Sequence, residues 1–130
     1  MELMQYLLDT NIVIYYFNGL TDDERIDALL IHSFNISIIT QMEFLGWSGF
    51  LTDENLYQKA QEFISHANVF DLAQGVVDKT ITLRQQHKIK MPDAIIAATA
   101  LVHGFGIATN NIDDFKRLVA ETLIINVLSG

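Results

Sequence analysis

Short apolar runs alternate with longer amphipathic segments along the chain. The apolar runs have the length of strands that are buried on both faces, whereas the longer segments repeat their apolar positions with the period of a helix. The strand-like runs cover residues 4–8, 34–38, 68–72, 106–109 and 123–127. Strands that alternate with helices are typical of parallel βαβ units, so the pattern predicts an α/β fold around a mostly parallel sheet.

Helix signals mark several of the segments between these runs. Residues 21–24 and 52–54 place capping and acidic side chains at a helix start, where the helix dipole favours negative charge. Pro92 opens the clearest helix, which is nearly all apolar, is therefore expected to be buried, and ends at His103 and Gly104. The expected helices cover about residues 10–18, 21–32, 40–46, 52–64, 76–87, 92–103 and 113–120.

Polar side chains occur where three of the strand-like runs end and where the long helix begins. The carboxyl ends of parallel strands share one edge of a sheet, and open α/β folds bind their ligands at this edge. Carboxylates gathered there without a Cys or His partner are hard oxygen ligands, which suit Mg²⁺ or Mn²⁺ and phosphate chemistry. The side chains at these positions are Asp9, Thr10, Asn11, Thr40, Glu43, Asp93, Thr109, Asn110 and Asn111.

Each of these residues also has an ordinary structural explanation when it is taken alone. Asp9 and Asp93 stand at predicted helix starts, where an N-terminal cap contributes about 1 kcal/mol. Glu43 fits a solvated acid in a first turn, and residues 109–111 fit a simple turn. The acids at residues 113–114 also fit a cap. The joint placement at one edge of the sheet is what favours a functional site.

The composition restricts the class of protein. The chain has 130 residues, half of them hydrophobic, and it contains no Cys and a single Pro. A disordered tail, a collagen-like repeat, a disulfide framework and a zinc ribbon all need a different composition, so these classes are excluded. We expect one globular domain over residues 1–130, because no linker or repeat divides the chain.

The charge and the N-terminus exclude two further classes. A formal net charge of −8 argues against a DNA-binding module, because such modules use a broad basic surface. The apolar N-terminus lacks the positive flank and the cleavage site of a signal peptide, and Asp9 interrupts it. No stretch of the sequence reaches the roughly 18 uninterrupted apolar residues of a membrane span. We therefore expect a soluble, cytoplasmic protein without membrane association.

Four segments resemble, in order and at similar intervals, the sequence blocks of PIN-domain ribonucleases, and especially those of VapC-like toxins of bacterial toxin–antitoxin pairs. The segments are LLDTNIVIYY, ITQMEFLGW, MPDAIIAATALVHG and IATNNIDDF, and they span residues 7–115. The resemblance implies a three-layer α/β/α sandwich and an Mg²⁺- or Mn²⁺-dependent endoribonuclease that cleaves single-stranded RNA. It also implies a homodimer and a cognate antitoxin whose C-terminal segment lies over the site.

The resemblance also assigns roles to individual residues. It implies that Asp9, Glu43 and Asp93 are the acidic residues that hold the metal, and that Thr10 and Asn11 orient the first of these carboxylates. A metal held by Asp9 and Asp93 would activate a water and stabilise charge on the phosphate. The first turn of the long helix would favour both the Asp93 carboxylate and a substrate phosphate.

The fourth segment departs from one common family pattern. Many members have an acid two residues after the Thr, where this chain has Asn111, whereas others have an acid before the Phe, as Asp114 stands before Phe115. Thr109 or Asn111 could donate a hydrogen bond to a phosphate oxygen. The sequence leaves open whether Asn111 or Asp114 completes the site, and whether the site holds one metal ion or two.

Two weaker features have both a structural and a functional interpretation. Four cations, Lys79, Arg84, Lys88 and Lys90, precede Asp93; they form either a solvated face or the place where an RNA backbone approaches. Three aromatic residues surround a Gly-bearing segment and either pack in the core or form a dimer or antitoxin surface. These aromatic residues are Trp47, Phe50 and Tyr57.

Two other functions compete with the nuclease. One is a catalytically inactive PIN-like binding or regulatory domain, which Asn111 and the net charge favour. The other is a receiver-like phospho-acceptor domain, which needs an acidic pair after the first strand and a Lys at a later strand end. Asp9 stands alone after the first strand and no Lys is suitably placed, so the receiver-like function is the weaker alternative.

Overall fold

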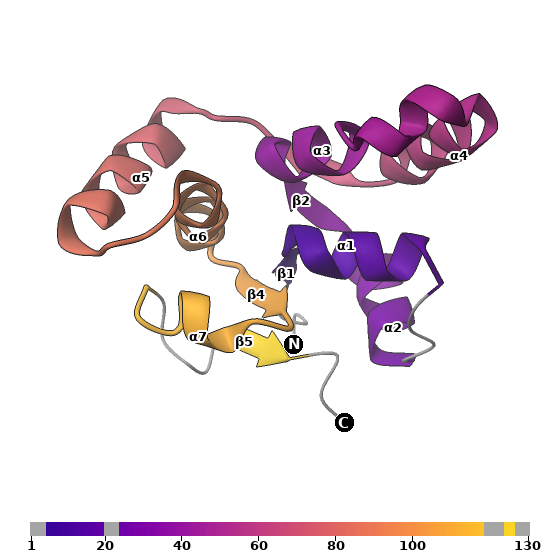
Figure 1. Ribbon diagram of the computed structural model, residues 1–130. Coiled ribbons are helices and arrows are strands. Elements are labelled where there is room, and N and C mark those ends of the chain that lie inside the picture. Colours follow the sequence, from indigo (N-terminus) through magenta and orange to yellow (C-terminus); the bar gives the residue numbers. More distant parts are fainter. Residues whose placement is uncertain (1–4, 20–23, 119–123, 127–130) are drawn as a thin grey trace.

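The computed structural model describes residues 5–19, 24–118 and 124–126. Its centre is a five-stranded sheet with the strand order β3-β2-β1-β4-β5, and each neighbouring pair of strands is parallel (Figure 1). This sheet confirms the predicted α/β fold class. The strands are β1 (Tyr6–Leu8), β2 (Asn35–Ser37), β3 (Asn68–Phe70), β4 (Gly106–Thr109) and β5 (Ile124–Asn126).

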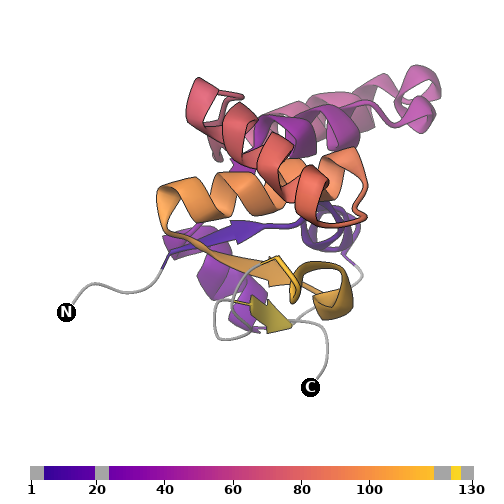
Figure 2. The ribbon, with the colours of Figure 1, turned by 90° about the vertical axis from the view of Figure 1, so that its left-hand side faces the viewer.

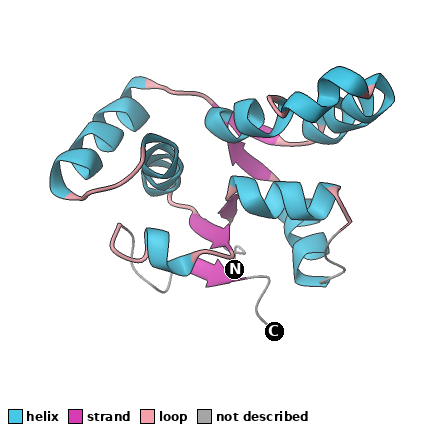
Figure 3. Ribbon diagram, viewed as in Figure 1, coloured by secondary structure: helices cyan, strands magenta, loops and turns pink. Residues whose placement is uncertain are grey.

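Helices fill the intervals between the strands, as the periodicity of the sequence predicts (Figure 3). None of the helices described here is long and apolar enough to cross a membrane. Parts of the predicted elements, at residues 4, 21–23, 119–120, 123 and 127, lie outside the described residues. The helices are α1 (Thr10–Phe17), α2 (Glu24–His32), α3 (Ile38–Leu45), the 3-10 helix η1 (Ser48–Thr52), α4 (Glu54–Ser65), α5 (Gln74–Gln86), α6 (Met91–His103) and α7 (Ile112–Phe115).

Two apolar cores lie on opposite faces of the sheet, because successive side chains of a strand point to opposite faces. Leu7 and Ile107 belong to the core that α5, α6 and α7 cover, whereas Leu8 and Ala108 belong to the core that α1, α3 and α4 cover. Figure 1 shows α6 and α1 on opposite sides of the central strands, and Figure 2 shows α6 lying along them. The resulting three layers confirm the α/β/α sandwich.

Side-chain caps decide where two of the helices begin. The Ser37 hydroxyl accepts a hydrogen bond of 3.1 Å from the Ile39 N–H, so β2 ends at Ser37 and α3 begins at Ile38. The strand therefore ends one residue earlier, and the helix starts two residues earlier, than the sequence predicts. Asp53 caps α4 as predicted, because its Oδ1 accepts a hydrogen bond of 3.0 Å from the Leu56 N–H.

The long helix α6 differs from the prediction only at its first residue. It begins at Met91, so Pro92 is its second residue rather than its first. The N–H groups of the first helical turn have no partner within the helix, and Pro is therefore tolerated at either position. At the other end Gly104 adopts a left-handed conformation with φ 70°, which confirms the predicted helix stop.

Side-chain amides connect three strands at the amino edge of the sheet. Asn35 is buried on β2, and its Nδ2 donates to Gln5 Oε1 at 3.2 Å and to the Tyr6 carbonyl at 3.0 Å. Its Oδ1 accepts a hydrogen bond of 3.1 Å from Asn68 Nδ2 on β3. We call Gln5, Asn35 and Asn68 the amide ladder. Asn35 is the buried member, and its hydrogen bonds to the other two residues and to Tyr6 compensate for its burial.

Candidate active site

Asp9 lies at the carboxyl end of β1 and in the N-cap position of α1. Its carboxylate makes no capping hydrogen bond to that helix. Instead, Asp9 Oδ2 accepts a hydrogen bond of 2.8 Å from Thr109 Oγ1, at the end of the neighbouring strand β4. The two strands meet here because the Asp9 N–H donates to the Ala108 carbonyl at 2.9 Å. The carboxylate therefore faces the edge of the sheet rather than serving as a cap.

The buried position of Asp9 perturbs its ionisation. The residue is only 6% exposed, and burial raises its pKa from 3.8 to about 6. The Thr109 hydroxyl, which donates to the carboxylate, and the nearby Thr10 N–H lower the pKa because they favour the charged form, whereas the charges of Asp93 and Glu43 raise it. Desolvation is the largest of these effects. The site keeps an acid in a position where ionisation is costly, which is common at functional sites.

Glu43 reaches the same edge from α3 and is held by a chain of two hydroxyl groups. Thr10 Oγ1 donates a hydrogen bond of 2.7 Å to Glu43 Oε1. Thr10 Oγ1 also lies 2.9 Å from Thr40 Oγ1, and both threonines are buried. Because the Thr10 hydroxyl has a single proton, which it gives to Glu43, the Thr40 hydroxyl must donate to Thr10. The sequence places Thr40 at the end of a strand-like run but indicates no role for it.

Asp93 is the third residue of α6 and is half-buried. Lys90 stands in the N-cap position, so Asp93 is not the cap of this helix. Burial raises the pKa of Asp93, and the charges of Asp114 and Glu43 raise it further, whereas Lys90 lowers it. Among the residues that the structure describes, no side chain or N–H forms a hydrogen bond with the Asp93 carboxylate. Asp93 is therefore the least compensated carboxylate of this edge.

Asn111 and Asp114 lie together, although the sequence treats them as alternatives. Asn111 Nδ2 donates to Asp114 Oδ2, and the Asn111 N–H donates to Thr109 Oγ1 at 2.9 Å. The Thr109 hydroxyl therefore accepts from Asn111 while it donates to Asp9. This series of hydrogen bonds, from Asp114 through Asn111 and Thr109 to Asp9, links α7 to the end of β1. Asn111, rather than either Asp113 or Asp114, occupies the N-cap position of α7, and it makes no side-chain capping bond.

Two asparagines of the predicted segments have different surroundings. Asn11 is exposed on α1 and has no hydrogen-bonding partner for its side chain among the described residues. Asn110 lies between Thr109 and Asn111, and its Oδ1 is buried without a partner in the described part of the chain. The sequence places Asn110 at the end of a strand-like run but indicates no role for it. The only sequence feature that could have pointed to Asn110 is its position next to Asn111.

The acidic side chains fit a divalent cation in chemistry and in charge. Asp9, Glu43, Asp93 and Asp114 offer only oxygen ligands, and their charges interact across the edge of the sheet. A cation among them would reduce this repulsion. Within residues 5–19, 24–118 and 124–126, no three His, Asp or Glu side chains converge as a finished coordination shell. The fit therefore rests on donor type and electrostatics rather than on ligand geometry.

An apolar pocket with a volume of about 290 Å³ adjoins Glu43. Trp47 on its rim is 58% exposed, whereas Phe50 is buried and packs against both Trp47 and Tyr57. The three aromatic residues thus differ in their surroundings: Phe50 is in the core, Tyr57 is half-buried against it and Trp47 is exposed. The pocket is lined by Ile14, Phe17, Asn18, Glu43, Phe44, Trp47, Phe50 and Leu56.

The chain is similar to known proteins at the level of both family and fold. The family model for the PIN domain matches residues 6–121. A comparison with curated protein sequences found no match.

Three solved structures illustrate the similarity of fold. A toxin–antitoxin complex from Klebsiella pneumoniae has a chain with 30% identity and a TM-score of 0.78, covering 97% of this chain and 100% of that one. VapBC from Salmonella typhimurium, bound to DNA, has 27% identity and a TM-score of 0.77, with 89% and 93% covered. VapBC2 from Rickettsia felis, bound to a promoter fragment, has 25% identity and a TM-score of 0.76, with 95% and 98% covered.

Proposed function

This chain belongs to the PIN domain family, and we propose that it is a metal-dependent endoribonuclease that cleaves single-stranded RNA in the cytoplasm. The proposal includes one nuclease domain over residues 1–130 and the role of the toxin in a toxin–antitoxin pair. The observation that supports it most directly is the buried carboxylate of Asp9, which is coupled to other acids at the carboxyl edge of the sheet. Such a group is suited to a cation and to phosphate chemistry.

We propose that Asp9, Glu43 and Asp93 hold Mg²⁺ or Mn²⁺. When bound, such a cation supplies a more acidic water and neutralises charge on the phosphate. The chain's own groups prepare this arrangement, because Thr109 directs the Asp9 carboxylate and Thr10 directs that of Glu43. Asp93 projects from the first turn of α6, where the free N–H groups favour an anion such as a phosphate.

Four polar residues complete the proposed site. Asp114 adds negative charge near Asp93 and is held by Asn111, so we propose that the two act together rather than as alternatives. Asn11 is exposed and is free to contact the RNA. The Thr109 hydroxyl donates to Asp9, whereas Asn111 Nδ2 has a second proton that is suited to orient a phosphate oxygen without adding negative charge.

The experiment that tests this function is a cleavage assay on fluorescent single-stranded and hairpin RNA with Mg²⁺, Mn²⁺ or EDTA. We expect cleavage of the unpaired RNA with metal and none with EDTA. Absence of cleavage of every RNA under all conditions, by a folded protein freed of any partner, would favour the second candidate. That candidate is an inactive PIN-like binding domain, and it is supported by Asn111 and by the lack of three convergent acids in the described residues.

We propose two protein partners. The solved relatives are toxin–antitoxin complexes, so the first partner is a cognate antitoxin whose C-terminal segment covers the site. The apolar pocket beside Glu43, with exposed Trp47 on its rim, is suited to the apolar side chains of such a segment. The second partner is another copy of the chain in a homodimer, which analytical ultracentrifugation of the purified protein tests.

A further inference from the structure

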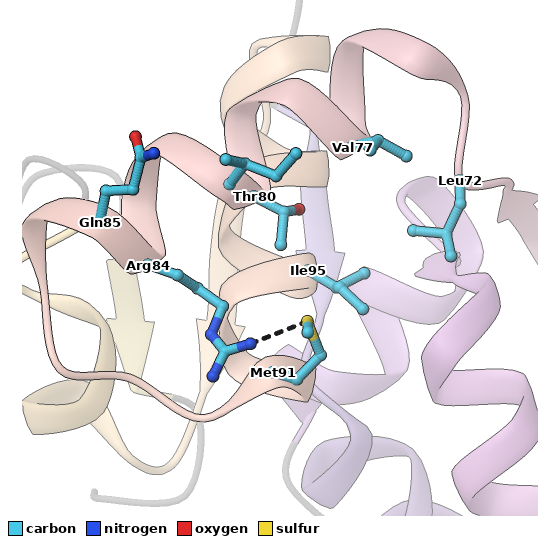
Figure 4. A pocket seen from close by; sticks show the side chains of 8 residues that line it. Leu72, Val77, Thr80, Arg84, Gln85, Met91 and Ile95 are labelled. Atoms are coloured by element: carbon cyan, nitrogen blue, oxygen red, sulfur yellow. Dashed lines mark hydrogen bonds between the residues drawn. The ribbon is translucent and has the colours of Figure 1, made fainter.

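A groove between α5 and α6 lies outside the candidate site. Figure 4 shows the side chains that line it, which come from both helices and from Leu72, the residue preceding α5 by two positions. The groove has a volume of about 440 Å³, within the range of about 300–1,000 Å³ that is typical of small-ligand sites. Leu72, Ile81 and Met91 are each about half exposed there. Such apolar exposure at a concave surface is typical of a binding site.

One cation, Arg84, lines this groove, and three others lie close to it in the sequence. Lys79, Arg84, Lys88 and Lys90 are half of the eight Lys and Arg residues of the chain, and the sequence between residues 79 and 92 contains no Asp or Glu. Arg84 lines the groove, where its guanidinium lies 3.7 Å from the Met91 sulfur (Figure 4). None of the four cations forms an ion pair with another described residue. Arg84 and Lys88 are therefore available to an anionic ligand, whereas the charge of Lys90 also acts on Asp93.

The groove and the candidate site share the first turn of α6. Met91 lines the groove, and Asp93 follows two residues later with its carboxylate at the sheet edge. Successive helical residues are only about 1.5 Å apart along the axis, so the two sites are separated by little more than the width of the helix. Lys88 and Lys90 lie on the connection that leads from α5 to this turn. A ligand that spans both sites would pass these cations.

We propose that the α5–α6 groove is a subsite for one unpaired base of the RNA, in a nucleotide that flanks the scissile bond. Arg84 and Lys88 contact the adjacent phosphates, and the apolar side chains of Leu72, Ile81 and Met91 contact the face of the base. This subsite deepens the proposed nuclease function and rests on it. The exposed amide of Gln85, which also lines the groove, can hydrogen-bond to a base edge.

Charge favours RNA over a second copy of the chain as the occupant. A two-fold contact through this groove would bring two acid-free cationic segments together, and like charges at an interface oppose association. An RNA strand instead supplies regularly spaced negative charges beside an apolar base. In a chain with a net charge of −8, this segment is the part suited to attract a polyanion.

The first test measures RNA binding in EDTA, where no cleavage is expected, by fluorescence anisotropy with a labelled single-stranded RNA of about eight nucleotides. Arg84→Gln and Lys88→Gln should each weaken binding at least about threefold and lower the slope of log K against log salt by about 0.7. Lys59→Gln, which removes an exposed cation from α4, is the matched control and should change neither quantity. Equal effects of all three variants would overturn the proposal.

The second test identifies the base. The test uses a series of RNAs, each of which lacks the base at a different single position. The parent protein should bind one RNA of the series less tightly than the others. Ile81→Gln should lose this difference and should stay folded, because the Ile81 side chain is half exposed. A position-independent response in the parent would overturn the base subsite.

Two further outcomes separate the failure of the subsite from that of the nuclease. Metal-dependent cleavage by the parent, combined with unchanged RNA binding by all groove variants, would overturn the subsite and leave the nuclease function standing. Analytical ultracentrifugation should give the same mass for the parent and Ile81→Gln. A dimeric parent and a monomeric variant would show that a second copy occupies the groove, which would also overturn the proposal.

Discussion

Thr109 Oγ1 donates a hydrogen bond of 2.8 Å to Asp9 Oδ2 across 100 residues of sequence. The two residues meet because β1 and β4 are neighbours and end at the same edge of the sheet. This hydroxyl opposes part of the effect of burial on the Asp9 carboxylate. The bond therefore links the strand order of the fold to the ionisation of its central acid.

Replacing Thr109 with Val should impair the site without removing any of its proposed metal ligands. Val keeps the shape of the side chain but removes the donor, so the pKa of Asp9 should rise above its present value of about 6. Loss of a group that directs a metal ligand typically costs about 10–100-fold in affinity or activity. The pH profile of RNA cleavage should move to higher pH, and Thr99→Val on α6, another buried Thr, should leave the profile where it is.

The acidic side chains should be individually required for cleavage. Asp9→Asn, Glu43→Gln and Asp93→Asn each remove one negative oxygen ligand at nearly constant volume, so we expect a loss of more than about 100-fold. Asp53→Asn is the control, because Asn also caps a helix and α4 lies outside the site. Initial rates at saturating Mg²⁺ measure the effect. Full activity in any of the three site variants would remove that residue from the proposed site.

The free energy of unfolding should fall as the pH rises between about 4 and 6. In this range the folded protein still holds the Asp9 proton, whose pKa is about 6, whereas the unfolded chain has lost it near 3.8. The loss should be on the order of 3 kcal/mol and complete above about pH 6. Urea unfolding in EDTA at several pH values measures it. Asp9→Asn should flatten the curve, and a parent that gains stability over this range would contradict the assignment.

Metal should stabilise the parent more than a variant of its proposed ligand. A cation that binds only the folded state adds about 2.7 kcal/mol at a hundredfold excess over its Kd. In EDTA at pH 7, Asp93→Asn should be at least as stable as the parent, because Asp93 ionises against burial and nearby acids. Thermal melts with EDTA and with Mg²⁺ compare the two proteins. Lower stability of the variant in EDTA, with equal Mg²⁺ shifts, would make Asp93 a structural acid.

Expression of the chain alone should arrest bacterial growth if it is a toxin. The Asp93→Asn variant, produced at the same level, should not arrest growth, because it lacks the proposed nuclease activity. Growth curves of matched cultures measure the arrest, and immunoblots measure the amount of each protein. Equal growth of the two strains would oppose the toxin role while leaving the nuclease chemistry untouched.

The sequence predicted the succession of strands and helices because their apolar periods differ. It placed the start of α3 at Thr40 instead of Ile38, since periodicity does not reveal that the Ser37 hydroxyl turns back to the Ile39 N–H. Such shifts are local. These shifts do not change which strand ends share an edge, so they do not change the predicted position of the candidate site.

The roles of individual polar residues were less predictable. Asp9 occupies an N-cap position, and only its partner 100 residues away distinguishes it from a cap. The hydroxyl chain from Thr40 through Thr10 likewise joins residues of two helices whose packing the sequence does not state. Phe50 and Trp47 are similar in chemistry, and their different exposure depends on how η1 folds against α3 and α4.

The amide ladder gives the sheet two edges of opposite character. At the amino edge the buried amide of Asn35 forms hydrogen bonds with two other amides that carry no charge, whereas the carboxyl edge holds acids that repel one another. A one-residue slip of β2 would separate Asn35 from its partners, so strand register is enforced far from the reactive acids. Substitutions of the acids at the carboxyl edge should therefore leave the strand register unchanged, because hydrogen bonds at the amino edge fix that register.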